Sequence, residues 1–162
     1  MKDMLLAINQ VNSRFLHKLT DDIPADKFCF QPVNLPNHPA WQVGHLTMVR
    51  SGAARMLGKP TDISDQWIEP FKRGSTPVND PSRYPTKEQL LATFDRAQAH
   101  LRDVLQDTDF ATLDRPHSLE FMLKAHPTLR QLLTNMLTTH DGLHFGQLSD
   151  WRRANGLPRV IS

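Results

Sequence analysis

Two histidines four residues apart, His140 and His144, have the clearest capacity for chemistry in this chain. On a helix, that spacing places both imidazoles on one face, about 6 Å apart along the axis. Two rigid imidazoles one turn apart can converge on a single divalent transition metal ion. A solvated helix face or a hydrogen-bonded core pair explains the spacing equally well, because the sequence holds eight histidines. The pair therefore predicts a metal site only if a further ligand joins it.

Length and composition narrow the class of protein. A chain of 162 residues predicts a single domain over 1–162 with a conventional core. The single cysteine, Cys29, excludes an intrachain disulfide and a Cys-rich zinc site, and it is typical of a reducing cytoplasm. No apolar run is long enough for a signal peptide or a membrane span. The net charge is only +2 and the basic residues are scattered, so we expect a cytoplasmic protein without nucleic-acid or membrane partners.

Four amphipathic stretches predict the helices that must position these histidines. In each stretch, apolar residues recur at steps of three and four, which is the helical period. The stretches run from about Lys2 to Thr20, from Pro39 to Leu57, from Thr86 to Leu105 and from Thr128 to Asn155. His38 or Asn37 is the expected cap of the second helix, and Thr86 and Gln89 have the spacing of a capping box.

The helices predict an all-α fold, because no alternating strand pattern accompanies them. An antiparallel four-helix bundle is the expected architecture. Its connections over 59–85 and 107–127 are long and must cross the ends or sides of the bundle. Connections of this length often cover a functional site or are disordered.

His45 is the best candidate for a third ligand. It lies in phase with Trp41, Met48 and Val49, so it is expected to point toward the interior of the bundle. A buried histidine loses its hydration and needs a partner. A hydrogen bond to a neighbouring core side chain is one solution, but three imidazoles directed at one interior space favour a metal ion. Three nitrogen ligands leave a position open for water or substrate, as in catalytic zinc sites.

The segments around these histidines resemble the DinB-like family. The motifs are PAWQVGHL at 39–46, HDGLHFGQL at 140–148 and WRRANGLP at 151–158. The resemblance implies a four-helix bundle with a divalent metal, commonly zinc or nickel, held by His45, His140 and His144. It also implies a relation to isomerases and S-transferases that use mycothiol, bacillithiol or glutathione. A small-molecule substrate, a low-molecular-weight thiol and a homodimer are the corresponding expectations.

Three further residues are candidates for contacts around the metal. Gln147 shares the face of His144 and is expected to orient a bound water or a ligand ring, unless it is only a polar contact at the end of the core. Trp41 lies one turn before His45 on the same stripe. Tyr84, the only tyrosine, is a candidate proton donor. The 59–85 connection carries aromatic and basic residues that either line the mouth of the site or form a solvated loop.

A three-histidine metal ion has two main chemical uses. It lowers the pKa of bound water to about 7 for hydrolysis, or it binds a thiol as the nucleophilic thiolate. Cys29 lies outside the histidine framework, so the thiol must come from a small molecule. Asp141 takes the place of the glutamate in the zinc-protease motif HExxH, but it is one carbon shorter, which disfavours a peptidase.

Three hypotheses follow for the function. The first is a thiol-dependent S-transferase or isomerase, and the second is a hydrolase that uses metal-activated water. The third is a non-catalytic bundle with a structural metal. Because the ligands must be neutral imidazoles, the sequence predicts that metal affinity falls as the pH drops through about 6.5, the ordinary histidine pKa.

Overall fold

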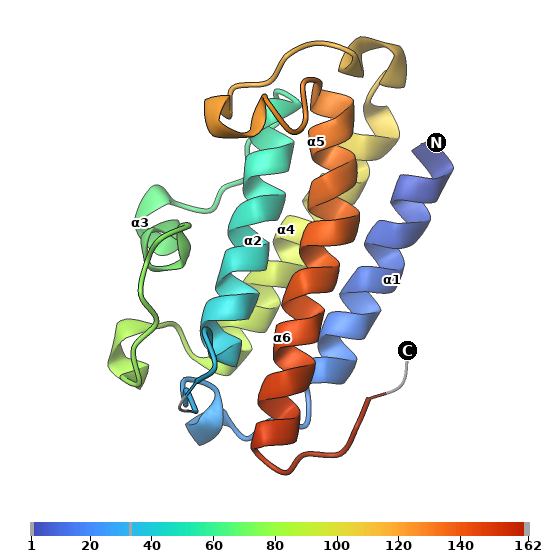
Figure 1. Ribbon diagram of the computed structural model, residues 1–162. Helices are drawn as coiled ribbons and strands as arrows, with labels where there is room; N and C mark the ends of the chain where they lie inside the picture. The colour runs from blue at the N-terminus through green and yellow to red at the C-terminus, as the bar shows by residue number, and fades with distance from the viewer. Residues whose placement is uncertain (1, 33, 161–162) are drawn as a thin grey trace.

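The computed structural model describes residues 2–32 and 34–160, and no strand occurs in these ranges. The long helices are α1 (Lys2–Thr20), α2 (Pro39–Met56), α4 (Lys87–Asp107) and a C-terminal rod made of α5 (Leu129–Asn135), a π turn (Met136–His140) and α6 (Asp141–Ala154). They lie side by side along the molecule (Figure 1). The predicted all-α class is confirmed, and each long helix begins and ends within two residues of its predicted bounds.

The structure differs from the prediction in two places. The last helix is interrupted by the π turn, which the hydrophobic pattern does not reveal. The connections also contain the short helix α3 (Asp65–Ile68) and single 3₁₀ turns at Ala25–Lys27, Glu69–Phe71, Pro81–Arg83, Phe110–Leu113 and Glu120–Met122. Within the described residues, every helix falls short of the length and apolarity that a membrane span requires.

Helix starts follow from side-chain capping. His38 begins α2, because its Nδ1 accepts a hydrogen bond from the Trp41 N–H at 3.1 Å and Pro39 occupies the first helical position. Capping boxes open α4 and α5, at Thr86 with Gln89 and at Thr128 with Gln131. The predicted cap at His38 and the predicted capping box at Thr86 are therefore confirmed.

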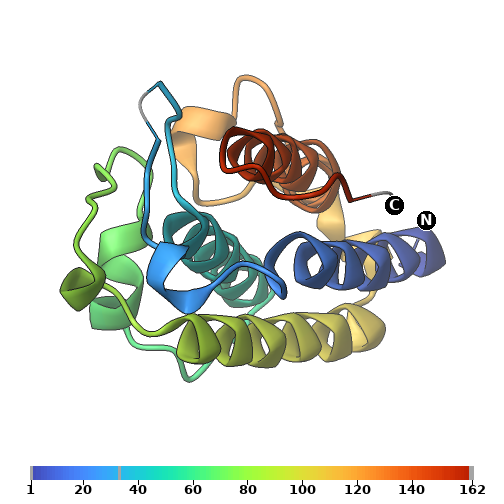
Figure 2. The same ribbon diagram turned by 90° about the horizontal axis from the view of Figure 1, so that it is seen from below.

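Seen from below, the long helices surround a common centre (Figure 2). Buried apolar side chains between them form two clusters. The first includes Leu16, Leu19, Phe28, Val43, Leu46, Phe71, Phe94, Phe145, Leu148 and Trp151. The second includes Leu5, Val49, Ala53, Leu101, Leu105, Leu132, Leu133 and Leu137. His45 lies between Val43 and Val49 in sequence, and His140 lies between Leu137 and Phe145. Both histidines therefore sit at the level where the two clusters meet.

The 59–85 connection packs along α2 rather than extending into solvent. The side chains of Ile63, Ile68 and Phe71 are buried, and both α3 and the turn Glu69–Phe71 contact α2. The basic residues Lys72 and Arg73 are exposed. The connection thus acts as a cover for one side of α2, with its apolar residues inward and its charges outward.

Candidate metal centre

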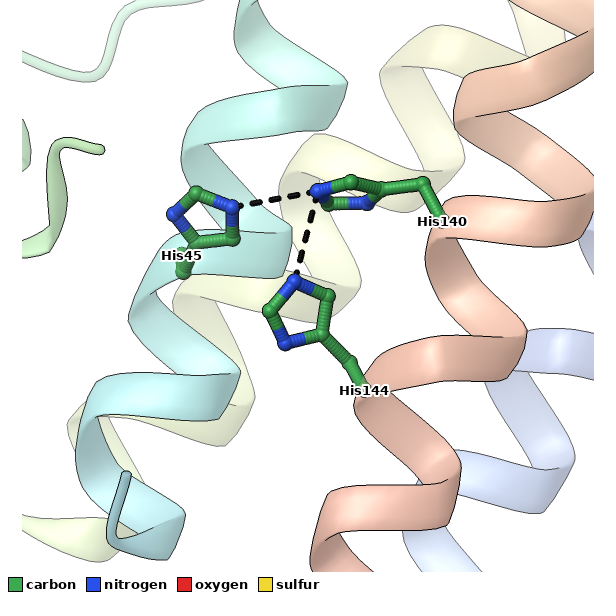
Figure 3. A group of neighbouring side chains, drawn as sticks. All are labelled: His45, His140 and His144. Atoms are coloured by element: carbon green, nitrogen blue, oxygen red, sulfur yellow. Dashed lines mark hydrogen bonds between the residues drawn. The ribbon is translucent and has the colours of Figure 1, made fainter. Parts of the chain in front are cut away.

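Three imidazoles meet between α2 and the C-terminal rod (Figure 3). His45 comes from α2, His140 ends the π turn, and His144 follows one turn later on α6. The Nε2 atom of His140 lies 3.2 Å from Nε2 of His45 and 3.3 Å from Nε2 of His144. One ligand atom from each ring lies within 4.8 Å of the other two. The structure thus brings together the three residues selected from the sequence, whose role as ligands remains a prediction.

Hydrogen bonds at Nδ1 determine where two of these rings carry their proton. Nδ1 of His45 lies 2.7 Å from the carbonyl oxygen of Phe71, which can only accept. Nδ1 of His144 donates in the same way to Oε1 of Gln42. In each neutral ring, the proton therefore resides on Nδ1 and Nε2 keeps a lone pair. Both lone pairs face Nε2 of His140.

This donor set fits a divalent cation. Nε2 of His140 carries at most one proton, so it can satisfy only one of the two lone pairs that face it. Buried acceptors without a donor cost free energy, whereas one cation can accept all three lone pairs. At tetrahedral angles, Zn–N bonds of about 2.0–2.1 Å separate two ligand nitrogens by about 3.3 Å. The separations of 3.2 and 3.3 Å match that value.

Burial keeps the three imidazoles neutral. Loss of hydration is the main cause that lowers the pKa of His140 to about 4 and the pKa of His144 to about 3. The pKa of His45 is lowered for the same reason, and the positive charge of Arg50 acts in the same direction on all three rings. Protons therefore compete for the His140 and His144 nitrogens near pH 4 and below, rather than near 6.5 as ordinary histidine pKa values predict.

We expect the free energy of unfolding of the metal-free protein to fall as the pH drops from 6.5 to 4.5. In this window a histidine of the unfolded chain becomes protonated, because its ordinary pKa is 6.5, but folded His144 stays neutral to about pH 3. The unfolded chain binds more protons, so stability rises with pH and is lost on acidification. At about 1.4 kcal/mol per pH unit, His144 alone contributes a loss of roughly 2–3 kcal/mol.

Urea unfolding of chelator-treated protein at the two pH values measures this loss. The matched control is the variant His144→Gln, which has no ring to titrate and should lose less stability over the same window. Equal losses in the wild-type protein and the variant would show that His144 is not held neutral by the fold.

The sequence analysis does not identify the hydrogen-bond partners that orient His45 and His144. The carbonyl of Phe71 belongs to the backbone and has no signature in the residue types. Gln42 precedes His45 by three residues and shares its helix face, so a usable signal was present. Its side chain is fully buried, and its Nε2 donates to Oε1 of Gln147 at 2.6 Å.

Gln147 and Trp41, which were predicted to lie around the metal, are connected to the histidines in different ways. Gln147 acts through Gln42, because its Oε1 accepts from Gln42 and from Nδ2 of Asn37 at 2.9 Å. Trp41 stacks on His45, with ring centroids 4.6 Å apart, and its indole N–H donates to Ser75. Trp41 therefore forms one wall of the site.

Tyr84 packs near the start of α2, against His38 and Phe71. Its ring lies edge-on to His38, two turns before His45 on α2, at a centroid distance of 4.9 Å. Its hydroxyl accepts a hydrogen bond from the Val78 N–H at 3.0 Å. These contacts give Tyr84 a packing role, and they offer no support for its candidate role as a proton donor.

Two other groups with the potential for catalysis are also unsuited to it. Asp141 is fully buried and bound to Arg50, so its carboxylate is not a free base. Cys29 is buried in the core, and loss of hydration raises the pKa of its thiol to about 11. Its thiolate is therefore scarce at neutral pH. The disfavoured peptidase and the external source of any thiol nucleophile stay predictions.

Comparison with known families gives one match, which covers most of the chain. A family model described as the DinB superfamily matches residues 10–148, a range that includes all three clustered histidines. The match covers the motifs at 39–46 and 140–148 and ends before the one at 151–158. No curated protein matches the chain.

Proposed function

This chain belongs to the DinB superfamily, and on that premise we propose that it is a metal-dependent enzyme. The ion is held by the Nε2 atoms of His45, His140 and His144. The observation that carries the proposal is the approach of the His45 and His144 Nε2 atoms to 3.2 and 3.3 Å from Nε2 of His140. Zinc and nickel are the expected ions, because both suit neutral imidazole ligands.

The reaction we propose is thiol-dependent transfer to, or isomerisation of, a small molecule. Three protein ligands leave a coordination position open. When bound, the ion supplies the Lewis acidity that keeps a thiol in its thiolate form at neutral pH. The only cysteine of the chain has a raised pKa, and Asp141 is occupied by Arg50. A low-molecular-weight thiol is therefore the proposed source of the nucleophile.

The neighbouring residues have defined tasks in this proposal. The Phe71 carbonyl and Gln42 hold the protons of His45 and His144 on Nδ1, so that both Nε2 lone pairs face the ion. Trp41 covers one face of His45 and excludes water from that side. The proposal also includes the antiparallel four-helix arrangement, one domain over 1–162, a homodimer and a cytoplasmic location.

We expect the metal-loaded protein to consume an electrophile only when a thiol is present. The assay combines zinc- or nickel-loaded protein with an electrophile and with mycothiol, bacillithiol or glutathione in turn. Its control is His45→Asn, which removes one ligand and should abolish the thiol-dependent rate. No turnover with any thiol, by protein shown to hold one ion, would reject the transferase or isomerase.

The same assay distinguishes the two alternatives. Turnover of an ester or amide without thiol would favour a hydrolase that uses metal-activated water. If His45→Asn lowers the thermal stability and no activity is found in either protein, the metal is structural.

A further inference from the structure

His140 differs from the other two candidate ligands in how its ring is held. His45 and His144 each have a hydrogen-bond partner at Nδ1, namely the Phe71 carbonyl and Gln42. Nδ1 of His140 is buried, and no described residue provides a partner for it. Metal-binding histidines are normally oriented by a hydrogen bond at the second ring nitrogen. Without a hydrogen bond at Nδ1, the orientation of the His140 ring depends more strongly on the backbone that carries it.

The backbone at His140 has an unusual conformation. His140 is the last residue of the π turn Met136–His140, and Asp141 is the first residue of α6. A π turn widens the helix locally and changes the rotation of the residues that follow, and such turns are frequent at functional sites. Whatever fixes Asp141 also fixes the direction of the adjacent His140.

Asp141 is fixed by a fully buried ion pair with Arg50. The Arg50 atoms Nη2 and Nη1 lie 2.6 and 3.0 Å from Oδ2 and Oδ1 of Asp141, which is a bidentate geometry. Asn12 of α1 donates to the same carboxylate at 2.9 Å. On α4, Gln98 accepts from Nε of Arg50 at 2.8 Å. Asp141 is thus connected directly to α1 and α2, and through Arg50 to α4.

The ion pair joins the same two elements that carry the histidines. Arg50 follows His45 by five residues on α2, which corresponds to about 7.5 Å along the helix axis. Asp141 directly follows His140. The Arg50–Asp141 pair and the His45–His140 approach are therefore two neighbouring links between α2 and the C-terminal rod.

We propose that Arg50 and Asp141 are positioning residues for the metal centre. Their ion pair sets the separation and rotation of the two rods, so that Nε2 of His140 faces the other two nitrogens. The inference rests on the proposed metal binding. Stability alone gives little reason for such a pair, because apolar residues of similar size often replace buried ion pairs without loss of stability.

The main test is the double variant Arg50→Met/Asp141→Leu, which removes both charges and leaves neither one unpaired. We expect a helical protein with a zinc dissociation constant raised about 10- to 100-fold, the range observed when groups that orient ligands are removed. We also expect an altered visible absorption spectrum with Co²⁺, because the ligand geometry changes. Zinc affinity is measured by competition with a chromophoric chelator, and folding by circular dichroism.

A second buried arginine, on the C-terminal rod, provides the matched control. Arg152 is bound to Asp22 and to the Leu19 carbonyl, three turns beyond His140. The double variant Arg152→Met/Asp22→Leu should change thermal stability but leave zinc affinity and the Co²⁺ spectrum unchanged. Arg50→Lys retains the charge and loses the bidentate contact, and it should raise the dissociation constant even if the main variant does not fold.

The outcomes separate this inference from the proposed function. If the wild-type protein binds zinc and the folded Arg50 variants bind it equally well, the positioning role is overturned and the metal centre stands. If the control variant weakens zinc binding as much as the main variant, the effect is a general one and the positioning role is again overturned. If the wild-type protein binds no ion, both proposals fail.

Discussion

Replacing His45 with asparagine is expected to weaken zinc binding by roughly 100- to 1,000-fold. Four-ligand zinc sites in small peptides bind with about 10–16 kcal/mol, which corresponds to about 2.5–4 kcal/mol for each ligand. A loss of that size is a factor of about 100 to 1,000 in the dissociation constant. Asparagine leaves a polar side chain of smaller volume beside Trp41 and the Phe71 carbonyl. Competition with a chelator of known affinity measures the change.

His38→Asn is the matched control for this prediction. His38 is also buried beside α2, but it lies two turns from the cluster and caps the helix through Nδ1. Asparagine retains an oxygen for the cap. At zinc concentrations of about 1,000 times the dissociation constant, the wild-type protein and this control should gain about 4 kcal/mol of stability. An equal gain in His45→Asn would mean that His45 is not a ligand.

Gly44→Ala is expected to destabilise the protein by at least about 2 kcal/mol. A Cβ atom at this position overlaps Cδ1 and Cε1 of Phe71, whose ring is completely buried. Overpacking in a rigid core typically costs about 1–3 kcal/mol, and the Phe71 ring has no exposed side toward which to move. Displacement of Phe71 also moves the carbonyl that accepts from His45, so zinc affinity should fall.

Gly52→Ala provides the control on the same helix. No atom beyond the adjacent residues and the backbone of α2 itself lies within 4 Å of a Cβ placed at Gly52, so the substitution adds helix propensity without a clash. It should stabilise the protein by up to about 1 kcal/mol and leave zinc affinity unchanged. Urea unfolding tests whether the free energy of unfolding falls in Gly44→Ala and rises in Gly52→Ala. A Gly44→Ala protein as stable as Gly52→Ala would show that Phe71 does not pack against α2 at this glycine.

The helices were predictable from the sequence because their determinants are local. The apolar period, the capping box at Thr86 and the cap at His38 act over a few residues. The π turn is a different case: it directly precedes Asp141, whose carboxylate contacts Arg50 and Asn12 on other helices. No pattern within the last helix encodes those contacts.

The three histidines of the candidate site were predictable from the sequence, but their hydrogen-bond partners were not. The spacing of His140 and His144 and the phase of His45 place three rings on inward faces, and the structure brings them together. The partners at Nδ1 depend on tertiary contacts, since Phe71 reaches His45 from a connection that carries no helical period. The shift of the imidazole pKa values was missed for a similar reason, because it comes from burial, then from the neighbouring imidazoles and from the charge of Arg50.

Elemental analysis of protein purified without an affinity tag, combined with X-ray absorption at the metal edge, tests the metal centre most directly. The protein should hold one zinc or nickel ion per chain, with nitrogen neighbours at about 2.0–2.1 Å for zinc. The triple variant His45→Asn/His140→Asn/His144→Asn should hold none. A wild-type protein that takes up no ion from excess zinc or nickel, or a triple variant that retains one, would contradict the assignment of these histidines.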